Sequence, residues 1–286
     1  MDYMTHTLFG VAIYGALNKL NMDTKTKWAL FATSVGANVI PDIDVQWTRA
    51  SADYLMSHRG FTHSFFMVPV WAALFSFLSY VVFRVLDRRI FLTAVTGVLL
   101  HIISDWSNAW GIGLFEPFVS NRYAGGFIPN KGYIFWGFMA VLLPFFALYR
   151  AKEHRQRIFR VFWILGAVYS GFQIVHSAYV YMDLKNEGYS QVAIRADRLP
   201  GGISYYAKKD DIVVEGRHEV GGDSGIVQTY RNDPVDVEQL RRYRPARDLL
   251  LFAPFVVTQD EGDRIRVFDP RFAGRVSILS VDVPKT

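Results

Sequence analysis

The chain of 286 residues contains no cysteine. This absence excludes disulfides, thiolate metal sites and cysteine nucleophiles. Any bound metal ion must therefore be held by histidine, aspartate, glutamate or asparagine side chains. That ligand set suits zinc, manganese or iron better than copper(I) or iron–sulfur chemistry.

The short motifs of several enzyme classes are also missing from the sequence. There is no His-Glu-x-x-His, no P-loop and no dinucleotide-binding glycine motif. The net charge is +5, but the basic residues cluster in short loops between apolar segments. This pattern indicates a membrane topology signal, so we expect no nucleic-acid partner.

Apolar residues are abundant, at 51% hydrophobic and 16% aromatic, which is high for a soluble protein. Residues 64–83, 90–106, 133–149 and 159–182 have the length and composition of membrane spans. Residues 5–17 and 28–40 are weaker candidates, because they are shorter and the second contains Ser34 and Asn38. We therefore expect residues 1–185 to form an α-helical membrane bundle of about six helices, four of them clear spans.

The basic residues predict how this bundle is oriented. Loops 18–27, 84–89 and 150–160 hold eleven lysines and arginines. The loops on the opposite side hold four, namely Arg49, Arg59, Arg122 and Lys131. The positive-inside rule places the first set in the cytoplasm.

The composition changes after about residue 186, where β-branched residues alternate with Gly, Pro and Asp. Strands are predicted at 190–197, 203–207, 211–218, 225–231, 248–258, 264–268 and 275–283, with a short amphipathic helix at 235–243. We expect residues 186–286 to form a small, mostly β extramembrane domain, outside the cytoplasm by the same topology.

Seven residues in the first 105 positions are of metal-ligand type. They are His6, Asp42, Asp44, His58, His63, His101 and Asp105. Ionisable residues in a membrane cost roughly 2.5–3.5 kcal/mol each at the bilayer centre and usually mark functional sites. The predicted topology brings all seven to one membrane surface. Seven ligands exceed one tetrahedral zinc and suit two or more ions bridged by a carboxylate, for which Asp42 and Asp105 are the candidates.

Two of these pairs also have simpler explanations. His101 and Asp105 lie one helical turn apart, where they could form a buried hydrogen-bonded pair. Asp42 and Asp44 follow Pro41, where they could end one helix and cap the next. The metal interpretation therefore depends on the whole set of residues.

The segment from His58 to His63 is more informative, because Gly60 allows a turn that lets both imidazoles converge. Arg59 lies between them. It could bind a phosphate or carboxylate of a substrate in a bidentate manner, or instead contact lipid headgroups. Thr62 could orient a neighbouring imidazole or cap a helix.

These segments resemble a family of membrane-bound metal-dependent hydrolases, also labelled LexA-binding, inner-membrane-associated hydrolases. The matching elements are Thr5-His6, Pro41-Asp42-Ile43-Asp44, His58-Arg59-Gly60-x-Thr62-His63-Ser64, and His101-x-x-x-Asp105 followed by Asn108. The family is distantly similar to the zinc-dependent phospholipase C and nuclease group, which implies phosphoester hydrolysis by clustered His and Asp ligands. The resemblance also implies the bacterial cytoplasmic membrane. The β domain lies outside the matching part.

The first functional hypothesis is an integral-membrane metal-dependent hydrolase that uses zinc, or alternatively manganese, in two or more ions. It would act on a phosphoester or ester of a membrane lipid or lipid-linked substrate at the outer membrane–water interface. Asp105 and Arg59 are the residues expected to take part in the reaction.

The second hypothesis is a non-catalytic membrane scaffold with a structural metal site and a β domain that binds a protein partner. A third is a transporter or channel with a His and Asp ion path, which predicts ligands spread through the membrane depth.

Overall fold

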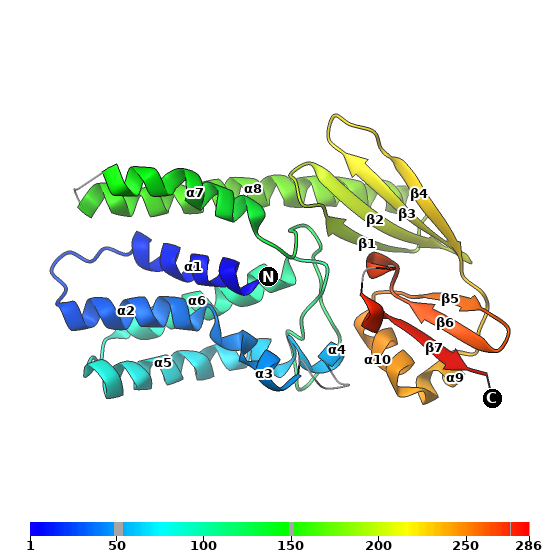
Figure 1. Cartoon of the computed structure of the whole chain (residues 1–286), viewed down its shortest axis with the longest axis horizontal. Helices are drawn as coiled ribbons and strands as arrows, with labels where there is room; N and C mark the ends of the chain where they lie inside the picture. Colours follow the sequence, from blue (N-terminus) through cyan, green and yellow to red (C-terminus); the bar gives the residue numbers. More distant parts are fainter. Residues whose placement is uncertain (49–53, 149–151, 275, 286) are drawn as a thin grey trace.

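The computed structural model describes residues 1–48, 54–148, 152–274 and 276–285 (Figure 1). Its first part is helical, as predicted. The helices are α1 (Tyr3–Ala16), α2 (Thr24–Ala37), α3 (Val45–Thr48), α4 (Tyr54–Ser57), α5 (Met67–Phe83), α6 (Arg88–Trp106), α7 (Tyr133–Leu148) and α8 (Lys152–Asn186). The short 3-10 helices η1 (Ile40–Asp44) and η2 (Phe61–His63) lie between them. Predicted features at residues 49, 149, 150 and 275 lie outside the described residues.

Aspartate caps define where three helices of the bundle begin. The side chains of Asp2, Asp23 and Asp87 accept hydrogen bonds from backbone N–H groups in the first turns of α1, α2 and α6. Helix α1 packs tightly on α2 because Gly10 has no side chain. A Cβ at this position would lie only 2.6 Å from the Ser34 carbonyl oxygen. This close contact brings the end of α2, and the η1 segment after it, beside α1 and α6.

The number of clear membrane spans is smaller than the four predicted. Among the described residues, α6 and residues 156–186 of α8 are long and apolar enough to cross a membrane. A third span is obtained if Tyr54–His63 and Met67–Phe83, bent by 65°, are counted as one. Helix α7 is shorter and contains Pro144, and α1 and α2 have 14 residues each. At 1.5 Å per residue, 14 residues reach about 21 Å, less than a bilayer core of about 30 Å.

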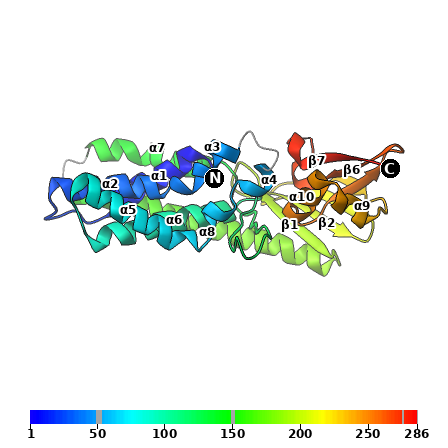
Figure 2. The same ribbon diagram turned by 90° about the horizontal axis from the view of Figure 1, so that it is seen from below.

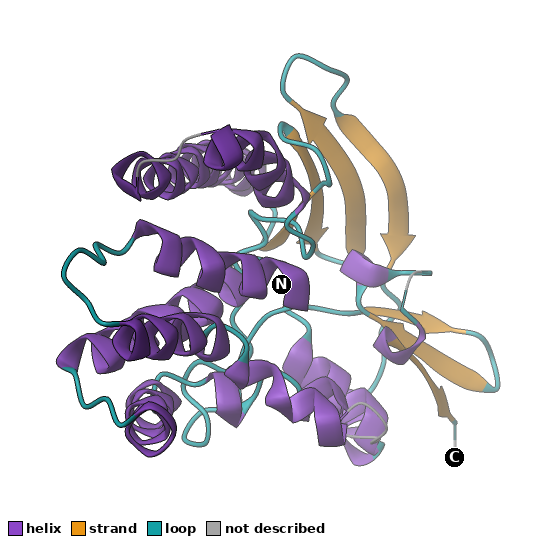
Figure 3. Cartoon of the chain, turned by 60° about the vertical axis from the view of Figure 1, so that its left-hand side comes forward, coloured by secondary structure: helices purple, strands orange, loops and turns teal. Residues whose placement is uncertain are grey.

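The second part of the chain contains two antiparallel sheets. Strands β1 (Gln191–Ala196), β2 (Gly202–Lys209), β3 (Ile212–Glu219) and β4 (Gly225–Arg231) pair in sequence order. Strands β5 (Val257–Asp260), β6 (Arg264–Phe268) and β7 (Ser280–Pro284) form the other sheet. Helices α9 (Val237–Arg242) and α10 (Arg244–Phe252) come between the sheets in the sequence. Figure 3 shows the strands gathered in one part of the molecule, apart from the bundle of long helices.

The prediction of a strand over 248–258 is wrong for its first half. Residues 248–252 belong to α10, and strand β5 begins at Val257. Leu249 and Phe252 are buried one turn apart on the same face of α10. A short apolar run does not distinguish a buried strand from a buried helix by periodicity alone, and here packing favours the helix.

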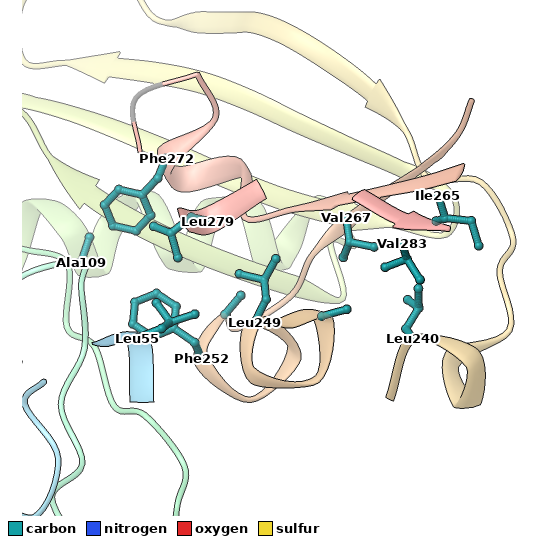
Figure 4. Close-up of a cluster of buried hydrophobic side chains, with 12 residues drawn as sticks. Leu55, Ala109, Leu240, Leu249, Phe252, Ile265, Val267, Phe272, Leu279 and Val283 are labelled. Carbon is teal, nitrogen blue, oxygen red and sulfur yellow. The ribbon is translucent and has the colours of Figure 1, made fainter. Parts of the chain in front are cut away.

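The two parts of the molecule share a hydrophobic core (Figure 4). Leu55 of α4 and Ala109 of the loop after α6 pack in one cluster with Leu249 and Phe252 of α10. Helix α8 extends from the bundle to the first sheet and packs there against β1, β2 and β3 (Figures 1 and 2). The β domain is therefore fixed to the end of the bundle where α3 and α4 lie.

Candidate metal centre

All seven predicted ligands lie together at the end of the bundle that faces the β domain. His6 comes from α1, Asp42 and Asp44 from η1, and His101 and Asp105 from the last turns of α6. His58 follows α4 and His63 ends η2. All seven are buried, with exposed fractions between 0% and 8%. The ligands are thus gathered at one end and do not extend along the bundle, contrary to the distribution expected of an ion path.

The first ligand group contains Asp42, His63, His101 and Asp105. One ligand atom from each lies within 4.8 Å of the others. The Nε2 atom of His63 is 3.3 Å from Asp42 Oδ1, 3.1 Å from His101 Nε2 and 3.5 Å from Asp105 Oδ2. Two imidazole nitrogens and two carboxylates thus point at one small volume, the donor set of a zinc or manganese site.

The second ligand group contains Asp42, Asp44 and His58. The Nδ1 atom of His58 lies 3.0 Å from Asp44 Oδ1. Asp42 belongs to both groups. Its carboxylate therefore joins the two groups into one cluster.

His6 lies at the edge of the first group. Its Nε2 atom is 3.2 Å from Asp105 Oδ1, and its ring stacks on that of His101 with centroids 3.7 Å apart. Asp105 therefore contacts His6 on one side and His63 on the other. His6 is in this way a fifth residue beside the four of the first group.

Neighbouring groups orient the imidazole rings. His101 Nδ1 is 2.7 Å from the backbone oxygen of Asn38, so this nitrogen carries the proton and the Nε2 lone pair faces the cluster. The Thr62 hydroxyl donates to Asp44 Oδ2 at 3.0 Å and lies 2.9 Å from His63 Nδ1. Such contacts hold the ligand atoms in place before any ion binds.

Arg59 is buried and points into the cluster. It has a left-handed backbone conformation with φ of 58°. Its Nε atom lies 3.0 Å from Asp105 Oδ2, and its guanidinium donates to Asn108 Oδ1 at 3.2 Å and to the Met1 carbonyl. The amino group of Met1 also contacts Asp105. Two cationic groups therefore lie against this carboxylate.

The cluster meets the requirements of a cation site. The Nδ1 atom of His6 is buried without a hydrogen-bond partner among the described residues. The Asp105 carboxylate is buried against Arg59, the Met1 amino group and His6. Burial raises the pKa of Asp42, but the neighbouring His101 and His63 lower the pKa more, so it lies below its ordinary value. Burial likewise raises the pKa of Asp44, but the hydrogen bond from His58, the nearby His63 and the backbone N–H of Arg59 together lower it below its ordinary value. Ionised carboxylates and imidazole lone pairs that converge in a buried site are groups that could hold a metal ion, beside the positive charge that Arg59 and the Met1 amino group already bring to Asp105.

Two residues that support the site were not identified from the sequence. Arg122 donates to the carbonyl oxygens of His58 at 3.0 Å and Arg59 at 2.6 Å, and also to that of Met56. Glu116 faces Arg122 at 3.8 Å. Burial lowers the pKa of Arg122 to about 10, so it stays charged at neutral pH. No local pattern signals these contacts, which join residues about 60 positions apart.

The fold and the site define a membrane-associated helical protein with a buried cluster of His and Asp residues. The sequence profile of the YdjM inner membrane protein family matches residues 1–180, and the chain belongs to this family. This region contains all seven cluster residues.

A curated relative is the uncharacterized protein YfhP of Bacillus subtilis, with 29% identity over 153 residues. The match covers 51% of this chain and 47% of the relative, so the chain spans about half the length of the curated relative it matches. No solved structure matches the chain.

Proposed function

We propose that this protein is an integral-membrane metal-dependent hydrolase that cleaves a phosphoester or ester in a membrane lipid or lipid-linked substrate. The observation that carries the proposal is the pair of ligand groups that share Asp42. Two ions about one bridging carboxylate are the arrangement of two-metal hydrolases. Zinc is the metal we expect, with manganese as the alternative.

The chain's own residues would hold and orient the reacting groups. Ions bound there would supply Lewis-acid polarisation of the substrate and would lower the pKa of water. Arg59, whose Nε atom lies 3.0 Å from Asp105, would provide positive charge that attracts an anionic group of the substrate. Asp105 would either bind an ion or accept a proton through its carboxylate oxygens. Water is the co-reactant: for a phosphodiester, the water oxygen would bond to phosphorus while the P–O bond to the leaving group breaks, and a water proton would pass to the leaving alkoxide, giving an alcohol and a phosphate monoester.

Exposed aromatic side chains around the site support a lipid substrate. Trp47 follows Asp44 by three residues and is 61% exposed, and Phe61 lies between two ligands and is 49% exposed. Phe66 and Phe118 are also exposed. Aromatic rings at the end of a membrane bundle lie at the headgroup level, where a lipid phosphoester would meet the site.

The test is metal content by mass spectrometry on detergent-purified protein, followed by hydrolysis of bis(p-nitrophenyl) phosphate. We expect near-stoichiometric zinc or manganese, and loss of both metal and activity in His63→Ala. His218→Ala removes an imidazole outside the cluster and should keep both. Full activity in a metal-free His63→Ala protein would contradict the proposal.

A non-catalytic scaffold is the second candidate, and the burial of the cluster favours it. His6, His63 and His101 have no exposed surface, and closed coordination is typical of structural metal sites. In that case the β domain would serve to bind a protein partner. Tightly bound metal with no hydrolysis of any phosphoester or ester lipid would support this candidate over the hydrolase.

A further inference from the structure

A cavity lies where the loop after α6 meets α8, β1 and α10. Its volume is about 570 Å³, which is within the range of small-molecule binding sites. Its aromatic walls are Trp106, Tyr123, Tyr181 and Phe252, and aliphatic side chains of β1 and α10 complete the apolar part of the lining. The cavity can therefore hold an apolar molecule between the membrane domain and the β domain.

Two buried N–H donors belong to this lining and have no acceptor among the described residues. They are the Nε1 atom of Trp110 and the Nε atom of Arg122. Only 1% of the Arg122 side chain is exposed. Buried donors without a partner are unfavourable, and an oxygen atom of a bound molecule would satisfy them.

The charged groups of the lining do not compete for these donors. Among the described residues no carboxylate lines the cavity, and Arg271 is the other charged residue there. Its Nε, Nη1 and Nη2 atoms already donate to Asp269 or to the Ala109 carbonyl. Glu116 faces Arg122 at 3.8 Å but does not line this cavity. The site thus suits a head group that accepts hydrogen bonds, and it does not suit an ammonium group, which can only donate.

The exposed part of the lining is aromatic and lies at the ends of the two clearest membrane spans. Trp106 ends α6 and Tyr181 lies near the end of α8, with exposed fractions of 37% and 42%. Aromatic rings at such positions lie at the level of the lipid headgroups. A hydrocarbon chain can therefore reach the cavity from the membrane interface.

Both donors are connected to the turn that carries His58. The Nη1 atom of Arg122 donates to the carbonyl groups of His58 and Arg59. The backbone N–H of Trp110 donates to Asn108 Oδ1 at 2.9 Å, and the same oxygen accepts from Arg59 at 3.2 Å. A molecule in the cavity would thus contact the residues that support the metal cluster from behind.

We propose that this cavity binds a long-chain acyl group whose carboxyl or ester oxygen accepts hydrogen bonds from Trp110 and Arg122. The hydrocarbon chain lies against the aromatic walls and extends toward Trp106 and Tyr181. A free fatty acid and an acyl ester of a membrane lipid offer the same chemistry. Binding at this site requires neither a metal ion nor hydrolysis, so it is independent of the proposed function.

The test is native mass spectrometry of the detergent-purified full chain, titrated with oleic acid, methyl oleate or oleylamine. Oleic acid should bind as one molecule per chain, and oleylamine should bind at least tenfold more weakly because its head group cannot accept. Trp110→Phe keeps an aromatic ring but removes the N–H group, so it should weaken the binding of oleic acid by roughly tenfold. Trp28→Phe, at a 60% exposed tryptophan of α2, is the matched control and should bind as wild type.

A second variant tests the location without removing a donor. Ala124 is an exposed residue of the lining, and Ala124→Phe adds a ring that fills part of the cavity. It should weaken the binding of oleic acid by tenfold or more. Because the position is exposed, this variant decides the question even if Trp110→Phe does not fold.

The two probes with an accepting oxygen distinguish the sources of the acyl group. Tighter binding of oleic acid than of methyl oleate indicates a free fatty acid, and equal or tighter binding of the ester indicates a membrane lipid. The proposal is overturned if neither probe binds, if oleylamine binds as tightly as they do, or if either variant retains the wild-type affinity.

Discussion

Asp42 is the single residue common to the two ligand groups of the cluster. It lies in the 3-10 helix Ile40–Asp44, whose second residue is Pro41, and its carboxylate is buried between His63 and His101. Asp44, two residues on, belongs only to the second group, although its Oδ2 atom also lies 3.5 Å from His63 Nδ1. The two carboxylates are close in sequence and similar in burial but differ in how many ion positions they would serve.

This difference predicts distinct metal contents for two isosteric variants. Asp42→Asn should lose nearly all bound metal, because it removes the bridging carboxylate of both groups. Asp44→Asn should keep about half. Metal analysis of the two purified variants and of the wild type tests this prediction.

Removal of metal from the wild type by a chelator should also lower Tm. The expected decrease is about 5–10 °C if the free metal ion was present at 100 times its Kd.

Equal metal loss in both variants would indicate that the groups form a single site. Asp197→Asn, at a carboxylate of the β domain that pairs with Arg217, is the control and should retain the wild-type metal content.

At the scale of elements, the site depends on the turn from α4 to η2 and on the loop that supports it. The carboxylate of Glu116 fills the space beside Gly60 and Gly113, where an added Cβ would lie 2.6 and 2.5 Å from its oxygens. The Gly113 N–H donates to the Arg59 carbonyl at 2.8 Å. Arg122 binds the carbonyl groups at the end of α4, as basic side chains do at helix C-termini.

We therefore expect Arg122→Ala to destabilise the turn by about 3 kcal/mol, because buried carbonyl groups lose charged donors. The His58 side of the cluster should lose its ion first, so metal content should fall toward half while the Asp42, His63, His101 and Asp105 group keeps its own. Thermal unfolding and metal analysis measure the two effects. Arg122→Lys should restore part of both, and a variant with full metal and unchanged Tm would refute this role.

The sequence predicted the helices and the set of candidate ligands, but it did not predict the contacts that support the site. His58, Gly60 and His63 form a local pattern whose spacing indicates convergence, and long apolar runs indicate the helices. Arg122 donates hydrogen bonds to backbone carbonyl groups some 60 residues earlier, and such contacts leave no trace in side-chain spacing. Glu116 supports Arg122 as its ion-pair partner. The α10 segment was mistaken for a strand because Leu249 to Phe252 is a short apolar run without a decisive period.

At the scale of the whole molecule, the α1–α2 and α5–α6 connections lie at the end of the bundle opposite the His and Asp cluster. The α1–α2 and α5–α6 connections, which carry predicted cytoplasmic charges, are at one end, and the cluster and β domain are at the other (Figure 1). The length of α6, 19 residues or about 28 Å, is close to the thickness of a bilayer core. The predicted orientation therefore assigns the cluster and the β domain to the same, non-cytoplasmic side.

The absence of cysteine makes this orientation directly measurable. Leu20→Cys lies in the exposed α1–α2 connection, and Asp223→Cys lies in the exposed β3–β4 hairpin. A membrane-impermeant maleimide applied to intact cells should label Asp223→Cys strongly and Leu20→Cys only after the membrane is disrupted. The cysteine-free wild type gives the background. The reverse pattern would invert the topology.

The core shared by α4 and the C-terminal sheet has a consequence for biosynthesis. Leu55, which precedes the His58 turn, packs in one cluster with Leu279 and Val283. During synthesis the first helices leave the ribosome long before those partners exist. The turn that positions His58 and Arg59 therefore gains its full packing only after residues 279–283 have been made and have docked, so the site is completed long after its own residues have been synthesised.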